Sequence, residues 1–187
     1  MDHYQEISLL PDPEFPPQVL MNALFGKLHR VLVGLDSQSL GVSFPDQDQD
    51  RPSLGGRLRL HGSRADLERL AASDWLSGMR DHTFLAGIRP VPGRASHVVV
   101  RRVQAKSNPE RLRRRLAKRR GLSLEEARCL IPEATEQRLG LPFLTLRSHS
   151  TGHTFRLFIE HSQPQAGPVV GLFSQYGLSL GATVPWF

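Results

Sequence analysis

The chain has 187 residues, and 39% of them are hydrophobic, a length and composition that exclude a disordered chain and allow one domain or two small ones. No apolar run approaches the roughly 20 residues of a membrane span, and the polar start Met1–Glu6 excludes a secretion signal. The only cysteine, Cys129, excludes an internal disulfide and a multi-cysteine zinc site. We therefore expect a soluble, cytoplasmic protein without a membrane partner.

Positive charge is concentrated in one segment, residues 101–120. The segment holds eight Arg and two Lys against one acidic residue, Glu110, so it carries +9, while the whole chain carries +6 and the remainder therefore −3. A local excess of this size is typical of polyanion binding, and nucleic acid is favoured over membrane because no large hydrophobic face lies beside it. A solvated helix face, an import signal and a disordered tail are the alternatives that charge alone leaves open.

The first 90 residues alternate between strand and helix signals. Apolar residues recur with helical spacing in the expected helices, the second of which begins after a capping serine, Ser63. In chain order the expected segments are 3–10 (strand), 18–33 (helix), 41–44 (strand), 58–61 (strand), 65–72 (helix) and 83–88 (strand). This order is the βαββαβ pattern of the ferredoxin-like fold, so we expect the α+β class with a ferredoxin-like domain over residues 1–94.

Residues 95–187 are expected to form a smaller C-terminal domain that contains an arginine-rich helix and a β-hairpin. A linker over 93–97 would lead into it. The expected elements are a strand over 98–104, the arginine-rich helix, a helix over 124–130 capped by Ser123, hairpin strands over 144–148 and 155–159, and a glycine-punctuated β tail over 171–187.

The order of residues within the basic segment indicates a folded helix. Ser107 or Asn108 can cap it, Pro109 suits its first turn, and Leu112 and Leu116 are four residues apart and share one face. Four basic residues occupy a separate arc: Arg111, Arg114, Arg115 and Lys118. Because Arg outnumbers Lys in the segment, bidentate contacts to phosphates and base edges are favoured over diffuse attraction.

Seven motifs spread along the whole chain carry a resemblance to a known family. They are Pro11–Pro17 (PDPEFPP), Leu24–His29 (LFGKLH), Arg102–Leu116 (RVQAKSNPERLRRRL), Thr145–Ser148 (TLRS), Phe155–Ile159 (FRLFI), Tyr176–Ser179 (YGLS) and Val184–Phe187 (VPWF). Together they resemble the type I-F CRISPR repeat endoribonucleases, which cut precursor transcripts into guide RNAs. The resemblance covers the chain from end to end, and these motifs are highly specific.

The resemblance implies a ferredoxin-like N-terminal half, a smaller domain with the arginine-rich helix, and a CRISPR repeat stem-loop RNA as substrate. Cleavage would occur at the 3′ base of the stem, without metal or cofactor, by attack of the 2′-hydroxyl on the adjacent phosphate. The enzyme would bind the RNA as a monomer and stay on its product with other subunits of a surveillance complex. Two alternatives are a non-cleaving subunit that caps the guide-RNA hairpin and a generic RNA chaperone.

Three residues would carry the reaction if the resemblance holds. His29 would deprotonate the 2′-hydroxyl, Ser148 would hold that hydroxyl in place, and Tyr176 would lie close to the histidine. Without the resemblance, His29 is a surface or core histidine, Ser148 a turn residue and Tyr176 a packed aromatic. They are far apart in the sequence, so only the fold or the family can bring them together.

The resemblance also assigns RNA-binding residues. Arg102 and Gln104 are two apart on a strand and can pair with purine edges, and Phe155 would stack on the last base pair of the stem. Further RNA contacts are expected from Ser107, Arg111, Arg114, Arg115, Lys118 and Arg119. His149 and His153 flank the hairpin turn, but two histidines without a Cys or carboxylate pattern make a weak zinc site, so no metal is expected.

Overall fold

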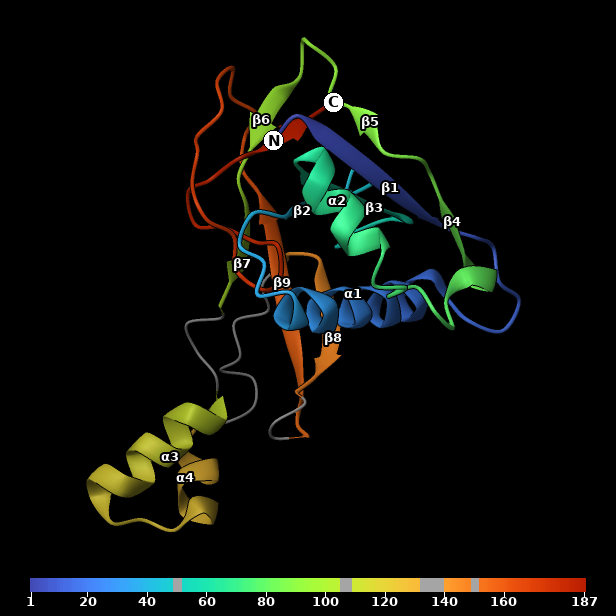
Figure 1. Ribbon diagram of the computed structural model, residues 1–187. Coiled ribbons are helices and arrows are strands. Elements are labelled where there is room, and N and C mark those ends of the chain that lie inside the picture. Colours follow the sequence, from blue (N-terminus) through green and yellow to red (C-terminus); the bar gives the residue numbers. More distant parts are fainter. Residues whose placement is uncertain (49–51, 105–108, 132–139, 149–151) are drawn as a thin grey trace. The chain divides into compact units, whose positions relative to one another are not determined.

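The computed structural model describes residues 1–48, 52–104, 109–131, 140–148 and 152–187, together with the backbone but not the side chains of 109–111. These residues divide into two compact units (Figure 1). The first unit is Met1–Arg102 with Leu141–Phe187, and the second is Val103–Gly140. The chain leaves the first unit after Arg102 and returns to it at Leu141.

One antiparallel sheet and two helices form the beginning of the first unit. In chain order the elements are β1 (His3–Leu9), α1 (Pro17–Gly34), β2 (Gly41–Ser43), β3 (Arg57–Gly62), α2 (Arg64–Ala71), a 3₁₀ turn (Arg80–His82), β4 (Thr83–Leu85) and β5 (Arg89–Pro90). The strand order is β2-β3-β1-β4, and β5 also pairs with β1. Both helices contact β1, and the mixture of helices with antiparallel strands confirms the α+β class.

The sequence signals for these two helices are confirmed. A proline occupies the first turn of α1, and Leu20, Leu24 and Leu28 on one face of the helix are buried against the sheet. Ser63 caps α2 by accepting a hydrogen bond from the backbone N–H of Asp66 at 3.1 Å. The buried stripe of α1 leaves a different face of the helix available for other contacts.

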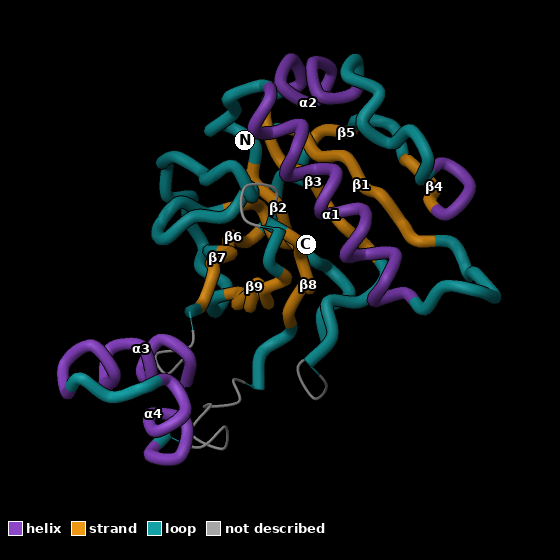
Figure 2. The backbone as a smooth tube through the Cα atoms, turned by 90° about the horizontal axis from the view of Figure 1, so that it is seen from below, coloured by secondary structure: helices purple, strands orange, loops and turns teal. Residues whose placement is uncertain are grey.

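Two smaller sheets complete the first unit. Their strands are β6 (Ser96–Val98), β7 (Val100–Val103), β8 (Phe143–Arg147), β9 (Thr154–His161) and β10 (Val184–Trp186). β10 pairs with β6, and a second sheet has the order β7-β9-β8 (Figure 2). Strands β8 and β9 form the predicted antiparallel pair, with Leu144 opposite Leu157. Their buried residues belong to the same hydrophobic core as β1 and α1.

The second unit contains the arginine-rich helix, α3 (Pro109–Arg120), and α4 (Leu124–Leu130). Ser123 and Glu126 form a capping box at the start of α4, as the sequence predicts. Arg113 differs from its basic neighbours because its side chain is buried and its Nε donates a hydrogen bond to the carbonyl oxygen of Ile131 at 2.9 Å. This arginine therefore joins α3 to the end of α4.

Four expectations about the chain after residue 82 need correction. The strand expected over 83–88 ends at Leu85, and the strand expected over 98–104 is divided into β6 and β7. The segment 93–97 is only partly a linker, since β6 begins at Ser96. Within the 171–187 tail only β10 is a strand. The reason is that β6 and β10 pair across more than 80 residues of sequence, a partnership that no local pattern reveals.

Candidate active site

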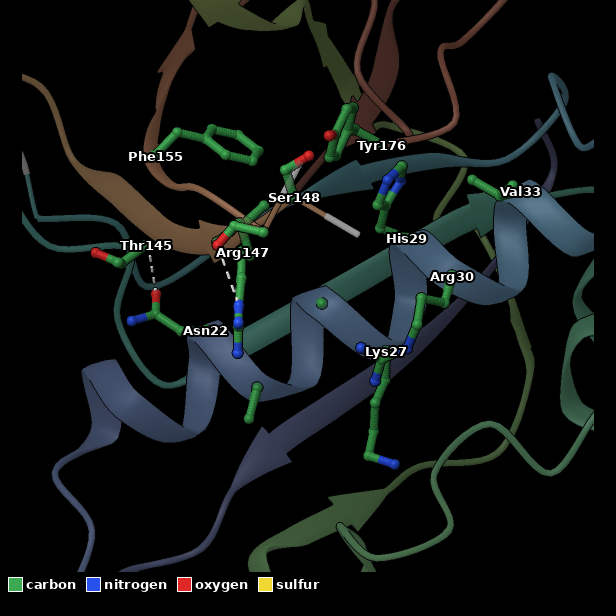
Figure 3. Close-up of a pocket in the computed structure, with 14 residues that line it drawn as sticks. Asn22, Lys27, His29, Arg30, Val33, Thr145, Arg147, Ser148, Phe155 and Tyr176 are labelled. Carbon is green, nitrogen blue, oxygen red and sulfur yellow. Dashed lines mark hydrogen bonds between the residues drawn. The ribbon is translucent and has the colours of Figure 1, made fainter. Parts of the chain in front are cut away.

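One cavity of about 1030 Å³ opens beside α1. It is lined by residues of α1, of β8 and its continuation, of the start of β9, and by one tail residue (Figure 3). The lining residues are Asn22, Ala23, Gly26, Lys27, His29, Arg30, Val33, Thr145, Leu146, Arg147, Ser148, Gly152, Phe155 and Tyr176. The three predicted catalytic residues and Phe155 are therefore brought to one place by the fold.

His29 is half-buried on α1, and its Nδ1 lies 2.9 Å from the backbone carbonyl oxygen of Gln175. A carbonyl oxygen can only accept a hydrogen bond, so Nδ1 must carry the proton and donate it. In the neutral imidazole this leaves Nε2 with a lone pair. The geometry therefore selects the tautomer in which Nε2 can accept a proton from a substrate.

Tyr176 stacks on His29, with ring centroids 3.9 Å apart and planes inclined by only 9°. The tyrosine ring also lies near the buried core residue Phe25, whose ring centroid is 6.4 Å away. A tight turn presents Tyr176, because the N–H of Gly177 donates to the carbonyl of Ser174 at 2.7 Å. Gly177 has a φ of +69°, a left-handed conformation that favours glycine.

Ser148 follows directly after β8 and is half-buried. Its backbone N–H donates to the carbonyl of His153 at 2.8 Å, and its own carbonyl accepts from the N–H of Gly152 at 2.9 Å. Nε of Arg147 also donates to the carbonyl of Gly152, at 3.1 Å. These hydrogen bonds hold the backbone of Ser148 in a defined position at the edge of the cavity.

The cavity carries positive charge. Three cationic side chains, Lys27, Arg30 and Arg147, line it, and the part of the lining that the structure describes contains no Asp or Glu. Nζ of Lys27 donates to the carbonyl of Ser77 at 2.6 Å, which fixes one of these charges. A cleft lined by one sign of charge attracts ligands of the other sign, so the site suits an anion such as a phosphodiester.

Two of the predicted RNA-binding residues lie next to each other beside the cavity. The guanidinium carbon of Arg102, on β7, is 5.9 Å from the ring centroid of Phe155 on β9. The ring is half-buried, whereas Arg102 is exposed. Gln104 is also exposed, but it lies just beyond the end of β7. The expectation that it shares a strand with Arg102 is therefore wrong.

The remaining predicted RNA-binding residues belong to the basic segment. Four of them are exposed on α3: Arg114, Arg115 and Lys118, which belong to the predicted arc, and Arg119. Arg111 also lies on α3, but its side chain is outside the description, and Ser107 lies outside the described residues. The roles of all these residues in RNA binding stay predictions.

Sequence reasoning missed several residues that line the cavity. The spacing of Gln18, Asn22, Gly26 and His29 forms a second, polar stripe on α1, and this helical periodicity could have revealed Asn22. Arg147 stands beside Ser148 in the TLRS motif and could have been singled out for its charge. Gln175 could not have been found, because it contributes only its backbone carbonyl.

The described residues were also searched for clusters of metal-binding side chains and for helices that could span a membrane. Across the described ranges, no three His, Cys, Asp or Glu side chains gather in a way that could hold a metal ion. The same ranges contain no helix of the length and apolar character needed to cross a membrane. His153 is exposed, and His149 lies outside the described residues.

Comparisons of the sequence with a family model and with curated proteins point to the same family. The model of the family described as CRISPR-associated protein (Cas_Csy4) matches residues 4–187. Two curated proteins named CRISPR-associated endonuclease Cas6/Csy4 match over 100% of both chains. The one from Pseudomonas aeruginosa (strain UCBPP-PA14) is 56% identical, and the one from Escherichia coli (strain UTI89 / UPEC) is 49% identical.

Among solved structures, one described as an RAMP protein binding different RNA substrates is similar at 13% identity with a TM-score of 0.35. The match covers 98% of this chain and 100% of that one.

Proposed function

The chain belongs to the Cas_Csy4 family of CRISPR-associated proteins, and we propose that it is a metal-independent endoribonuclease that cuts CRISPR precursor transcripts at the 3′ base of the repeat stem-loop. Its relatives at 49–56% identity match over their full length and are named CRISPR-associated endonucleases, so this chain is an endonuclease of that kind. The RNA substrate, the position of the cut and the chemistry are the parts that we propose.

The observation that carries the proposal is the hydrogen bond from Nδ1 of His29 to the carbonyl of Gln175, in the cavity that Ser148 also lines. It leaves Nε2 to take the proton of the 2′-hydroxyl, while Ser148 holds that hydroxyl. The 2′-oxygen then bonds to phosphorus as the bond to the 5′-oxygen breaks. The 5′-oxygen takes a proton from water, and the protonated His29 returns its proton to the hydroxide that remains. The products are a 5′-hydroxyl and a 2′,3′-cyclic phosphate.

The surroundings of the cavity support an RNA substrate. Lys27, Arg30 and Arg147 would attract the backbone phosphates. We propose that Phe155 stacks on the last base pair of the stem, that Arg102 and Gln104 read its purine edges, and that exposed residues of α3 contact the phosphates.

At the level of architecture and assembly, we propose that the β1-α1-β2-β3-α2-β4 portion is a ferredoxin-like domain, since its element order is βαββαβ. The division into domains over 1–94 and 95–187 is part of the same proposal. We further propose that the protein binds the stem-loop as a monomer and stays with the product in a surveillance complex with other subunits.

The test is cleavage of a type I-F repeat RNA in excess EDTA, beside the same RNA with a deoxy sugar at the scissile position. We expect the first RNA to be cut and the second to stay intact. His29→Ala should lower the cleavage rate by roughly 10²–10⁴-fold while leaving RNA affinity unchanged, because it removes only the base. Tight binding without cutting of either RNA by the wild type would instead identify a subunit that caps the guide-RNA hairpin.

A further inference from the structure

Two amide side chains of α1, Gln18 and Asn22, connect the helix that carries His29 to the strand that leads to Ser148. We propose that they are positioning residues, which fix the position of Ser148 relative to His29 along the axis of α1. This inference rests on the proposed function, since it concerns the geometry of the same reaction.

Four hydrogen-bonding groups make up the connection. The Oδ1 atom of Asn22 accepts a hydrogen bond from the backbone N–H of Thr145 at 3.0 Å (Figure 3). Nε2 of Gln18 donates to the backbone carbonyl of Phe143 at 2.8 Å and lies 3.4 Å from Oδ1 of Asn22. An amide nitrogen has two hydrogens and an amide oxygen two lone pairs, so each group in this network is satisfied.

The partners in the network also determine which way each amide faces. Asn22 must turn its oxygen toward β8 because the N–H of Thr145 can only donate. Gln18 must turn its nitrogen there because the carbonyl of Phe143 can only accept. The two amides therefore have opposite roles, and each role can be tested separately.

The position of β8 in its sheet explains why these amides matter. The order β7-β9-β8 makes β8 an edge strand, and in an antiparallel pair alternate residues turn their backbone groups to the open side. Phe143 and Thr145 are two such residues, and α1 meets this open edge. Gly26 continues the contact, because a Cβ built on it would lie 4.0 Å from a methyl carbon of Leu146.

The spacing of the contacts shows that helix and strand advance together. Gln18 and Asn22 are four residues apart, a rise of about 6 Å in a helix. Their partners Phe143 and Thr145 are two residues apart, which is about 6.6 Å in a strand. The helix and the strand therefore run in the same direction and rise by nearly the same distance between the two contacts. As a result, the two hydrogen bonds fit only one register of β8 along α1.

The same spacing extends to the candidate catalytic pair. His29 is seven residues beyond Asn22, two full helical turns on the same face and about 10 Å along the axis. Ser148 is three residues beyond Thr145, also about 10 Å in an extended chain. The hydrogen bond between Asn22 and Thr145 thus fixes the register of β8 along α1, and with this register His29 and Ser148 lie at the same height along the helix axis. A displacement of β8 along α1 would separate the base from the group that holds the 2′-hydroxyl.

Single-turnover cleavage at saturating enzyme, RNA affinity and thermal midpoint would be measured for the wild type, Asn22→Ala, Asn22→Asp and Gln18→Glu. We expect Asn22→Ala to cut about 10–100-fold more slowly with unchanged affinity and thermal midpoint, since misplacement of about 1 Å is enough for such a loss. Asn22→Asp keeps the accepting oxygen, whereas Gln18→Glu places a carboxylate against the carbonyl of Phe143. The network therefore predicts faster cutting by Asn22→Asp than by Gln18→Glu.

The order of these two variants separates positioning from charge. Each adds one negative charge, and Asn22 lines the cavity whereas Gln18 does not, so a purely electrostatic effect predicts the reverse order. The reverse order, equal rates, or a wild-type rate for Asn22→Ala would overturn the inference. A rate loss in Asn22→Ala that is matched by a loss of affinity or of thermal midpoint would also overturn it. Absence of cutting by the wild type itself would overturn the proposed function instead.

Discussion

At the scale of single residues, the candidate site depends on a backbone group. The backbone carbonyl of Gln175 accepts a hydrogen bond from Nδ1 of His29, which leaves Nε2 for the role of base that we propose. The Tyr176 ring covers one face of the imidazole. The stacking distance of 3.9 Å indicates that the aromatic ring is the part of Tyr176 that orients the histidine. The phenol oxygen is not needed for this contact.

This interpretation predicts different effects for two substitutions of Tyr176. Tyr176→Phe keeps the ring and should cut repeat RNA at close to the wild-type rate. Tyr176→Ala removes the ring and should cut about tenfold more slowly, because an aromatic stack contributes about 0.5–1.5 kcal/mol to fixing the imidazole. Single-turnover kinetics would measure both, and an equally large loss in the two variants would show that the hydroxyl takes part.

At the scale of elements, the turn over Ser174–Gly177 places both partners of His29. A Cβ at Gly177 would lie 2.7 Å from Cγ1 of Val42, and φ at this position is +69°. We expect Gly177→Ala to lower the free energy of unfolding by at least about 1–2 kcal/mol, the cost of the left-handed backbone alone. Cleavage should fall as well, since the turn carries Gln175 and Tyr176.

Urea denaturation and cleavage assays of Gly177→Ala would test this role of the turn. Gly181→Ala is the matched control, because a Cβ at Gly181 meets nothing within 4 Å. A stable and fully active Gly177→Ala variant would contradict the assignment.

Helix α3 offers a second prediction at this scale. Arg115 and Arg119 are exposed and one turn apart, so replacing both by Ala should leave stability unchanged. Affinity for repeat RNA should fall, and the slope of log K against log salt should become less steep by about 1.4–1.8, since each phosphate that is no longer neutralised changes it by about 0.7–0.9. Filter binding at several salt concentrations would measure the slope.

A matched control removes the same charge from the first unit. Arg64 and Arg69 are exposed on α2 and pair with Glu68 and Asp66. Their double replacement by Ala should leave the salt slope unchanged. Equal slopes for the α2 and α3 variants would show that α3 does not contact the RNA.

At the scale of the whole molecule, two histidines, the buried His61 and the half-buried His161, couple folding to pH. Burial lowers the pKa of His161 to about 4. Burial, and then the charge of Arg59, hold the pKa of the fully buried His61 well below its usual range. Both are neutral in the folded protein and accept a proton more readily when it unfolds. The free energy of unfolding is therefore highest above about pH 6.5 and falls as the pH drops below that value, and for His161 the loss continues to about pH 4.

Chemical denaturation between pH 7.5 and 4.5 would test this coupling. We expect the free energy of unfolding to fall by a few kcal/mol over this range, at about 1.4 kcal/mol for each pKa unit of a shifted group. His161→Gln keeps an acceptor for the backbone N–H of Phe44, which bonds to Nε2 of His161, but it does not titrate. Its stability should depend less on pH, and an unchanged dependence would assign the effect to other groups.

Local properties of this protein could be predicted from the sequence. The stripe of leucines on α1, the caps at Ser63 and Ser123 and the concentration of charge in α3 depend on residues within a few positions of each other. The motifs were also sufficient to predict the family, because a pattern of residues identifies relatives without any knowledge of contacts.

Only the tertiary structure decided how distant segments meet. It paired β6 with β10, turned Arg113 inward among exposed arginines, and brought His29, Ser148 and Tyr176 to one cavity. It also supplied the carbonyl of Gln175 and the hydrogen bonds from Gln18 and Asn22 to β8. The physical reason is that backbone groups look the same at every position of a sequence. Their partners are chosen only when the core packs and leaves particular strand edges open.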